Sequence, residues 1–487
     1  MFWRVNARGK RMHNPRTLEA YQLLHDGALA LAEVEKAGMP VDLEYCKRES
    51  KRTLMRANRL KEDILESDTG KLWKRIYGPR LNLNSPNQMR HIFFNILKLE
   101  PVGWTDTGRP ALDAQALDIM QLRYTLPFVQ DFIRMKRLMK IEGTYLRAFV
   151  AEAVGGIIHP FFNLHTVRSF RSSSNSPNFQ QLPLRDKVMG KIVRGAIKAP
   201  EGYCIVENDY SGMEVGIGAC SHLDRNMVSY ITDKTKDMHR DSAMELFKLR
   251  EDQMSKEIRQ SAKGGFVFPQ FYGSYYVECA KNLWDAVSQQ SLTLADGTPL
   301  RDHMDRVGLS ERGECDPELP TASGTFEHHV QNVERILWEE RFPVFANWRR
   351  EIYDSYKENL FFDSLTGFRY TGYFRRNEVI NFGTQGSAFH CLLRAVIILV
   401  GELKARGMQT RVIGQIHDSI VALVKMEEQQ EYLDLVYDIM ANRVKKEWSW
   451  IIVPLEVDAD VTPEAGSWAE KAPWVKTGRV WGPKEDK

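Results

Sequence analysis

The sequence lacks the features that would place a protein outside the cell or in a membrane. Its six cysteines are scattered and form no C-x-x-C pair, which argues against a zinc ribbon or a disulfide framework and fits a reducing compartment. The N-terminus has no apolar core of a signal peptide. The longest apolar stretch, residues 391–400, is interrupted by Arg394 and is too short to span a bilayer. We therefore expect a cytoplasmic protein with no membrane contact.

A strong net charge is also missing. The 67 Lys and Arg nearly balance the 64 Asp and Glu, leaving a net charge of +3. No global field marks the chain as a partner of polyanions, so any such site must come from local clustering of cations. We find no fixed-period repeat and no low-complexity tract. What is present is a globular composition, with 43% hydrophobic and 27% charged residues in a 487-residue chain, which predicts two or three subdomains.

The expected elements are mainly helical. Periodicity predicts helices over residues 16–66 with a break at Gly38, and another over residues 128–150. Ser85 followed by Pro86 predicts the start of a capped helix. A small sheet is expected around two strand-like runs, one at residues 204–212 and one at residues 412–424, and residues 286–325 are expected to form an irregular insertion. This pattern predicts an α+β fold in which helical blocks flank a small sheet.

Each of the strand-like runs leads into an aspartate. "CIVENDYSG" (204–212) contains Asp209, and "VIGQIHDSIVALV" (412–424) contains Asp418. Carboxylates that face one another are costly to bury unless cations neutralise them. Mg²⁺ binds through one or two carboxylates and leaves its other positions to water and phosphates, and two such ions can clamp a phosphoryl transfer. The alternative is that Asp209 caps a turn and that His417 and Asp418 form a hairpin turn.

A third segment, "RQSAKGGFVFPQFYGS" (259–274), combines cations with an aromatic residue. Arg259 and Lys263 are four residues apart, so a helix would present them on one face, and Tyr272 follows nine residues after Lys263. Such a helix suits a nucleoside triphosphate, with charge on the phosphates and a ring near the base. The alternative is a surface helix with an aromatic stripe packed in the core.

Together and in this order, the three segments resemble motifs A, B and C of the family A DNA polymerases, which include bacterial DNA polymerase I and phage relatives. Three further segments resemble that family: "RSSSNSPNFQQLP" with Arg171, Asn178 and Gln180, "DMHRDSA" with His239, and "NFGTQGSA" with Asn381 and Gln385. The resemblance extends from about residue 25 to the C-terminus. It implies a right-hand polymerase fold, with an antiparallel palm sheet and helical fingers and thumb. It also implies a division into a helical lead-in to the palm (1–40), the thumb (41–150), the palm with motif A (151–224), the fingers with motif B and the insertion (225–345), and the palm with motif C (346–487).

The resemblance implies template-directed addition of dNTPs to a primer 3′ end, with two Mg²⁺ ions for which Mn²⁺ can substitute. The implied metal ligands are Asp209, Asp418 and the carbonyl of Tyr210. The implied nucleotide contacts are Arg259 and Lys263 on the triphosphate with His239 nearby, Tyr272 at the template base, and Glu214 beside the sugar 2′ carbon. The implied DNA contacts are Arg171, Gln385 and Gln415 in the minor groove, whose acceptors are shared by all base pairs, with His417 near the primer terminus and Asn178, Gln180 and Asn381 in the same motifs. Lys263 would also act in catalysis. A core or helix-capping role is the alternative for His239.

Three departures from the family pattern stand out. Gly212 replaces the usual glutamine after Asp-Tyr-Ser, and Ser419 replaces the usual glutamate after His-Asp. The motif B helix has one residue more than usual between its lysine and its tyrosine. The aromatic residue that governs dideoxynucleotide discrimination is therefore Phe268 or Phe266, and counting back from the tyrosine favours Phe268.

Two other functions fit parts of this pattern. A catalytically inactive accessory protein that binds primer–template DNA is disfavoured by the intact aspartates and cations, and a single-subunit RNA polymerase is disfavoured by Glu214. The resemblance favours a phage enzyme acting in the bacterial host cytoplasm in DNA replication. Because the thumb-like region begins within the first 25 to 40 residues, we expect no intrinsic 3′–5′ exonuclease, and a separate exonuclease or processivity factor is a candidate partner.

Overall fold

The computed structural model of the chain describes residues 4–5, 11–12, 17–105, 107–124, 126–182, 187–289 and 292–484. The chain forms two compact units. The first unit comprises Met1–Val41, Val154–Leu182 and Ile197–Lys487, and the second comprises Asp42–Ala153 and Pro183–Ala196. Each unit is described by itself below.

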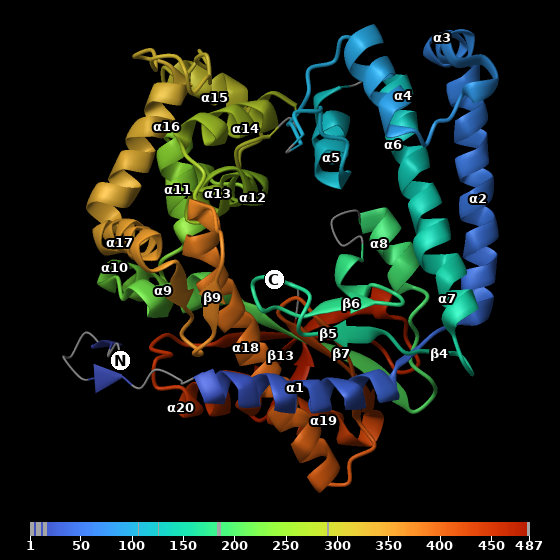
Figure 1. The fold of residues 1–487 in the computed structure, drawn as a ribbon, viewed down its shortest axis with the longest axis vertical. Helices are drawn as coiled ribbons and strands as arrows, with labels where there is room; N and C mark the ends of the chain where they lie inside the picture. Colours follow the sequence, from blue (N-terminus) through green and yellow to red (C-terminus); the bar gives the residue numbers. More distant parts are fainter. Residues whose placement is uncertain are drawn as a thin grey trace. The chain divides into compact units, whose positions relative to one another are not determined.

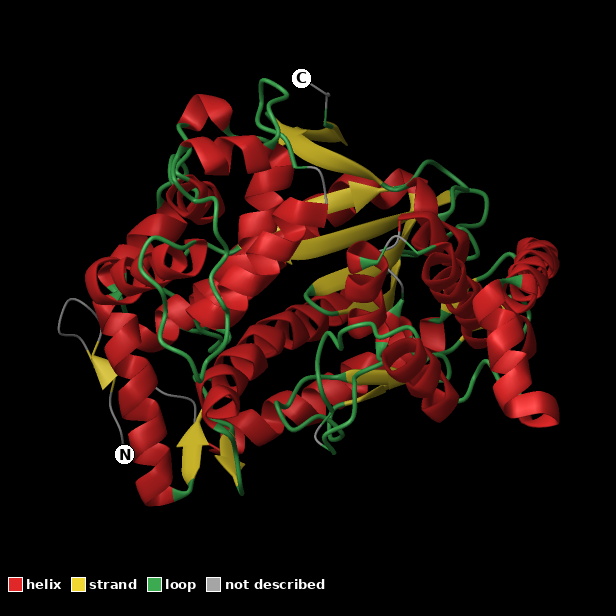
Figure 2. Ribbon diagram, turned by 90° about the horizontal axis from the view of Figure 1, so that it is seen from above, coloured by secondary structure: helices red, strands yellow, loops and turns green. Residues whose placement is uncertain are grey.

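The first unit is built on a six-stranded antiparallel sheet in the order β10-β11-β7-β12-β13-β14 (Figure 2). The strands are β7 (Tyr203–Ser211), β10 (Arg411–Ile416), β11 (Ser419–Lys425), β12 (Glu456–Val461), β13 (Ala472–Thr477) and β14 (Val480–Pro483). The apolar run at the start of β7 is buried, with Cys204, Ile205 and Val206 inaccessible to solvent. β7 is therefore an inner strand, paired on both sides by β11 and β12.

Long helices cover this sheet. α18 (Arg376–Ala405) packs against α1 (Thr17–Ala37) and against β10 and β11. The two helices approach closely at Gly27, where an added Cβ would lie 2.7 Å from Leu393 Cδ2. The apolar stretch at 391–400 thus belongs to a 30-residue helix, and the expectation that it is too short to span a bilayer is wrong by length. Of its most apolar window, 67% is buried inside the protein, as in the core helix of a globular fold.

The remaining helices of the first unit gather at one end of the sheet (Figure 1). They are α9 (Met213–His222), α10 (Arg225–Thr232), α11 (Met238–Phe247), α12 (Lys256–Ala262), α13 (Phe268–Phe271), α14 (Tyr276–Gln289), α15 (Leu300–Arg306), α16 (Phe326–Arg335) and α17 (Pro343–Asn359). Two other helices, α19 (Gln429–Tyr437) and α20 (Val444–Glu447), lie beneath the sheet in this view. The short strands are β3 (Met39–Pro40), β4 (Ile157–Ile158), β5 (Phe161–Asn163), β6 (Ser173–Asn175), β8 (Phe361–Asp363) and β9 (Arg369–Thr371), and β1 (Arg4–Val5) pairs with β2 (Arg11–Met12).

The second unit is helical and has its own core. Its helices are α2 (Leu43–Glu66), α3 (Asp68–Tyr77), α4 (Pro86–Arg90), α5 (Ala114–Arg123), α6 (Pro127–Lys140), α7 (Arg147–Glu152) and α8 (Lys187–Arg194). The core contains a cluster of stacked and edge-on rings formed by Trp73, Phe93, Phe128 and Phe132. On α6, Lys136 donates a hydrogen bond to Asn84 at 2.9 Å.

Most of the expected elements are found. α1 ends at Ala37, before Gly38 with its φ of +65°, and Ser85 caps α4 by accepting a hydrogen bond from the Gln88 amide. The α+β fold class is confirmed. The expectation of an irregular insertion at 286–325 is partly wrong, because this segment contains the end of α14 and the whole of α15.

Candidate active site

The sheet brings the two predicted aspartates together. Asp209 lies near the end of β7, and Asp418 lies in the tight turn between β10 and β11. The register pairs Asp209 with Ser419, the residue after Asp418, and the Tyr210 amide donates a hydrogen bond to the Asp418 carbonyl at 3.1 Å. His417 has a φ of +51°, as the tight turn requires. The hairpin turn considered as an alternative is therefore real, and it is what carries the second aspartate to the first.

The two carboxylates are electrostatically strained. Burial, followed by the charges of Asp418 and Glu207, raises the pKa of Asp209 to about 7. Burial also raises the pKa of Asp418 to about 6, against the opposing charge of Arg171. Among the described residues, no ion pair within 4.0 Å joins either carboxylate to a cation. A pair of oxygen ligands that lacks a counter-charge fits hard divalent cations such as Mg²⁺.

Further carboxylates flank Asp209 and were missed from the sequence. Asp458 on β12 is paired in register with Asp209 and accepts a hydrogen bond from Ser211. Beside it, Lys471 Nζ bonds to Glu207 at 2.6 Å and to Asp460 at 2.8 Å. The alternation of acids in "EVDADV" (456–461) is the period-2 signal that could have placed them on one face of a strand. Among the described residues no three His, Cys, Asp or Glu side chains converge as a metal site, so ions held here would also need ligands from a substrate.

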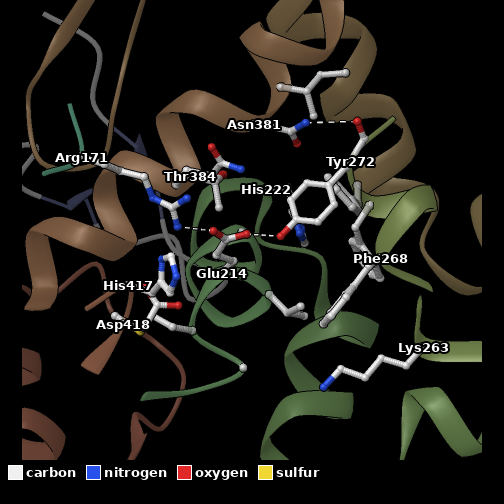
Figure 3. Close-up of a pocket in the computed structure, with 18 of the residues that line it drawn as sticks. Arg171, Glu214, His222, Lys263, Phe268, Tyr272, Asn381, Thr384, His417 and Asp418 are labelled. Atoms are coloured by element: carbon white, nitrogen blue, oxygen red, sulfur yellow. Dashed lines mark hydrogen bonds and ion pairs between the residues drawn. The ribbon is translucent and has the colours of Figure 1, made fainter. Parts of the chain in front are cut away.

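Glu214 occupies the centre of the neighbouring cavity (Figure 3). It lies in the first turn of α9, two residues after Gly212. The φ of +63° at Gly212 turns the chain from β7 into the helix. The Glu214 carboxylate accepts hydrogen bonds from Arg171 on one side and from the Tyr272 hydroxyl on the other. Burial and the Glu214 charge raise the pKa of Tyr272, so its hydroxyl stays protonated as a donor. The left-handed backbone at residue 212 explains why glycine suits a position where the family has glutamine.

The cavity has a volume of about 450 Å³ and collects most of the predicted nucleotide and DNA contacts. The predicted residues that line it are Arg171, Glu214, His239, Lys263, Phe268, Tyr272, Asn381, Gln385, His417 and Asp418. The lining residues that sequence reasoning missed include His222, Thr384, Phe345 and Trp348. Thr384 lies in the "NFGTQGSA" motif, whose resemblance could have pointed to it, whereas His222, Phe345 and Trp348 lie in helices whose pattern is that of ordinary core packing.

Lys263 and His239 lie on one side of the cavity, around the ring of Phe268. Lys263 Nζ lies 5.1 Å from the ring centroid of Phe268, and the His239 ring meets Phe268 edge-on at 5.6 Å. Burial, followed by the charges of Lys263 and Arg259, lowers the pKa of His239 to about 4, so the ring is neutral at pH 7. Its Nδ1 is buried and has no hydrogen-bond partner. A neutral imidazole carries one ring N–H and can donate it to an incoming anion.

Arg259 does not line the cavity. Its guanidinium forms an ion pair with Asp237, with Nε and Nη2 at 2.7 and 3.2 Å from the two carboxylate oxygens. Asp237 also caps α11 by accepting from the His239 and Arg240 amides. In this structure Arg259 is therefore held beside the cavity by the Asp237 carboxylate.

The glutamines and asparagines of the DNA motifs are held by hydrogen bonds within the protein. Gln415 accepts from Ser172 at 2.6 Å and from Gln180 at 2.9 Å, and it donates to the His417 carbonyl at 2.6 Å. Asn381 donates to the Tyr272 carbonyl at 3.1 Å. These bonds fix the turn that carries Asp418 and the end of the helix that carries Tyr272. Asn178 has a local role as well, because it caps a short helix by accepting from the Gln180 amide.

The electrostatic strain predicts that Asp418→Asn stabilises the ion-free protein. The native pKa of about 6 lies above the ordinary value of 3.8, so ionisation of Asp418 destabilises the folded protein. This destabilisation is absent below about pH 4, where the group is protonated in both states, and reaches its full size above about pH 6. We expect the variant to gain about 1–2 kcal/mol of unfolding free energy at pH 8 in a chelator, after allowance for solvent screening, and to gain nothing at pH 3.5. Thermal unfolding at the two pH values measures this, and equal gains at both would show that the strain is not electrostatic.

Comparison with known proteins extends these observations to most of the chain. A family model described as DNA polymerase family A matches residues 45–293 and 340–470. The chain is 25% identical to the DNA polymerase of Escherichia phage T5 over 480 residues, which cover 92% of this chain and 51% of that protein. It is 24% identical to DNA polymerase I of Bacillus subtilis (strain 168) over 434 residues, covering 88% of this chain and 44% of that protein. The chain thus spans about half the length of the curated relatives that it matches.

A solved structure shares the fold. The POL domain of Pol1 from M. smegmatis, in complex with DNA primer-template and dNTP, superposes with a TM-score of 0.70 at 22% identity, covering 92% of this chain and 70% of that chain. The expected right-hand polymerase fold is confirmed by this likeness.

Proposed function

Because the chain belongs to DNA polymerase family A, we propose that it catalyses template-directed addition of dNTPs to a primer 3′ end. The observation that carries the proposal is that the sheet places Asp209 beside the turn that holds Asp418, and that Asp418 lines a cavity together with Glu214, Lys263 and Tyr272. The solved relative is named as a complex with primer–template DNA and dNTP, which supports the same two ligands for this chain.

In the proposed reaction, the primer 3′ oxygen bonds to the α-phosphorus of the dNTP, the bond from the α-phosphorus to the bridging oxygen breaks, and pyrophosphate leaves. Asp209, Asp418 and the Tyr210 carbonyl would hold two Mg²⁺ ions, which supply charge stabilisation to the attacking and leaving oxygens. Lys263 carries a fixed positive charge on the side where negative charge moves to pyrophosphate. His239, neutral at pH 7, donates from a ring nitrogen to the triphosphate. Arg259 would join it by leaving Asp237.

The remaining residues orient the substrates in this proposal. Tyr272 stacks at the template-base position and Glu214 closes the space beside the sugar 2′ carbon. The DNA contacts proposed from the resemblance are Arg171, Asn178, Gln180, Asn381, Gln385, Gln415 and His417. The division into palm, fingers and thumb is proposed on the same basis, and the independent core of the second unit supports a thumb made largely of residues 41–150. Likeness to the phage T5 enzyme supports a role in phage DNA replication.

Replacing Glu214 with alanine is expected to admit ribonucleotides. The change removes the carboxylate that Arg171 and Tyr272 hold at the centre of the cavity, so both bulk and charge beside the 2′ position are lost. We expect the preference for dNTP over rNTP to fall by about 100-fold, the scale of a lost steric or polar discrimination. Single-nucleotide incorporation measures the ratio. Tyr272→Phe, which keeps the Glu214 bulk, is the matched control, and an unchanged ratio in Glu214→Ala would remove Glu214 as the gate.

Substituting tyrosine at Phe268 and at Phe266 is expected to have different effects on the incorporation of dideoxynucleotides. Phe268 lines the cavity, whereas Phe266 is fully buried in the core. Phe268→Tyr adds a hydroxyl to the cavity where a dideoxynucleotide lacks one, so we expect incorporation of ddNTP relative to dNTP to rise by about tenfold or more. Phe266→Tyr instead buries a hydroxyl among apolar side chains, and we expect it to lower stability by about 1–3 kcal/mol without changing the ratio. Competition assays and thermal unfolding of the two variants test this pair, and the opposite assignment would exchange the results.

Extension of a labelled primer with dNTPs or with rNTPs tests the proposed function against its alternatives. A polymerase adds the dNMP complementary to each template base and requires Mg²⁺ or Mn²⁺. An accessory protein would bind the duplex without extending it, and an RNA polymerase would prefer rNTPs. Lack of extension by folded, DNA-bound protein would overturn the proposal.

A further inference from the structure

A π-helical turn interrupts the helix that carries the nucleotide contacts. α12, the turn η6 (Lys263–Val267) and α13 form one continuous helical run, in which the Phe268 amide bonds to the Lys263 carbonyl, five residues back. Such turns insert one residue into an α-helix. Pro269 lies two residues after the turn and has no amide hydrogen to donate to an α-helical hydrogen bond. Its presence lowers the cost of interrupting the α-helical hydrogen bonds here. Other π turns occur among the described residues, and this one is distinguished by the side chains that it brings together.

The turn determines which side chains share a face. In an uninterrupted α-helix, residues five positions apart point about 140° away from each other. Across a π turn they align, and Lys263 Nζ accordingly lies 5.1 Å from the Phe268 ring centroid, with both side chains lining the cavity. Phe266, three residues after the lysine, is fully buried.

Two adjacent glycines within the turn have different surroundings. An added Cβ on Gly265 would lie 2.6 Å from Leu283 Cδ2 on α14, whereas one on Gly264 would meet nothing within 4 Å. The backbone of the turn therefore presses against α14 at Gly265, and Gly264 is the position with room to spare. The close approach explains how the widened turn is seated without moving the helices that flank it.

We infer that this π turn absorbs the extra residue between Lys263 and Tyr272 and so keeps Lys263 and Phe268 on one nucleotide-contacting face, with Gly265 as the positioning residue that seats it. The inference rests on the proposed function for the identity of the ligand, a deoxynucleoside triphosphate. It assigns a role to an insertion that would otherwise rotate the cation away from the aromatic residue.

Two variants that change the length of the turn in opposite directions test the inference. Deleting Gly264 leaves Lys263 and Phe268 four positions apart, which an unbroken α-helix again places on one face. Inserting alanine between Gly264 and Gly265 leaves them six apart, about 120° away from each other in an α-helix. Affinity for a fluorescent dNTP, measured on the DNA-bound protein, and the separate KM and kcat for extension are the readouts, with duplex binding as the check on folding.

We expect the deletion to keep dNTP affinity within about threefold, and the insertion to weaken it by about 100-fold, the scale of a displaced contact in an active site. Equal damage from both variants, or no effect of the insertion, would overturn the inference. If the wild type binds the dNTP but does not extend a primer, the proposed function fails while the affinities still decide this point.

A second pair isolates Gly265. Gly265→Ala is expected to weaken dNTP binding by about tenfold, and Leu283→Ala in the same chain is expected to restore it by making room for the added methyl group. Gly264→Ala is the matched control and is expected to have no effect. Failure of Leu283→Ala to rescue binding would show that the contact with α14 does not position the turn.

Discussion

Asp209→Ala and Asp418→Ala are each expected to abolish primer extension and to leave duplex binding nearly unchanged. Either change removes one of the two carboxylates that the pairing of β7 with β11 brings close together, because Asp209 lies opposite Ser419, the residue after Asp418. Without that oxygen ligand the site would not hold the proposed Mg²⁺ ions, whose positive charge would stabilise the attacking and leaving oxygens. We expect kcat to fall by at least about 1000-fold, the upper end of losses from a single electrostatic group. Single-turnover extension and a filter-binding titration measure the two effects.

The neighbouring carboxylate provides a matched control. Asp458 lies directly opposite Asp209 in the sheet and so is a close neighbour of the predicted metal ligand. It accepts a hydrogen bond from Ser211 and is not itself a predicted ligand. Asp458→Asn should lower activity by no more than about 10- to 100-fold, the usual cost of altering a residue beside a metal site without removing a ligand. If Asp458→Asn were as damaging as Asp209→Ala, the assignment of the aspartate pair as the metal site would be wrong.

The second large effect is expected from Lys263→Ala, which should raise the dNTP KM and lower kcat together. Lys263 lines the cavity and, among the described residues, forms no ion pair with a carboxylate. Arg259, the other predicted triphosphate contact, lies outside the cavity and is paired with Asp237. A positive charge that interacts more strongly as pyrophosphate forms acts partly in the transition state, so its loss cannot appear in KM alone. We expect kcat/KM to fall by about 100- to 1000-fold.

Lys256→Ala is the control for charge on the same helical run. Lys256 is exposed at the start of α12 and does not line the cavity. Its loss should leave KM and kcat unchanged. A result in which Lys263→Ala reduced only duplex affinity would place Lys263 among DNA contacts instead of at the triphosphate.

Local patterns in the sequence carried much of the site. The run before Asp209 predicts an inner strand because its apolar residues must be buried, and for His417 and Asp418 between two apolar runs a hairpin turn is the alternative to a metal ligand. That the two meet depends on strand pairing across some two hundred residues, which no local pattern contains. It was the order of the motifs, through their resemblance to a family, that supplied this pairing.

Other features could not be read from the sequence. The ion pair between Arg259 and Asp237 depends on how α11 and α12 pack, and spacing alone placed Arg259 on the cavity face with Lys263. The π turn at Lys263 breaks the 3.6-residue period by which residues are assigned to one face of a helix. Counting forward from Lys263 would therefore place Phe268 on the face away from the cavity, whereas counting back from Tyr272 favours it. The lining by His222 and Trp348 arises from helices that read as core.

We propose that this chain transfers nucleotides at the Asp209–Asp418 pair under the direction of a template. The most direct test follows one labelled primer annealed to four templates that differ in the next base, at saturating DNA, with wild type and Asp209→Ala compared at equal DNA occupancy. We predict that the wild type adds the one complementary dNMP in each case and releases one pyrophosphate per addition, and that Asp209→Ala binds the same DNA and adds none. Extension by Asp209→Ala at near the wild-type rate, or additions by the wild type that ignore the template base, would contradict the account.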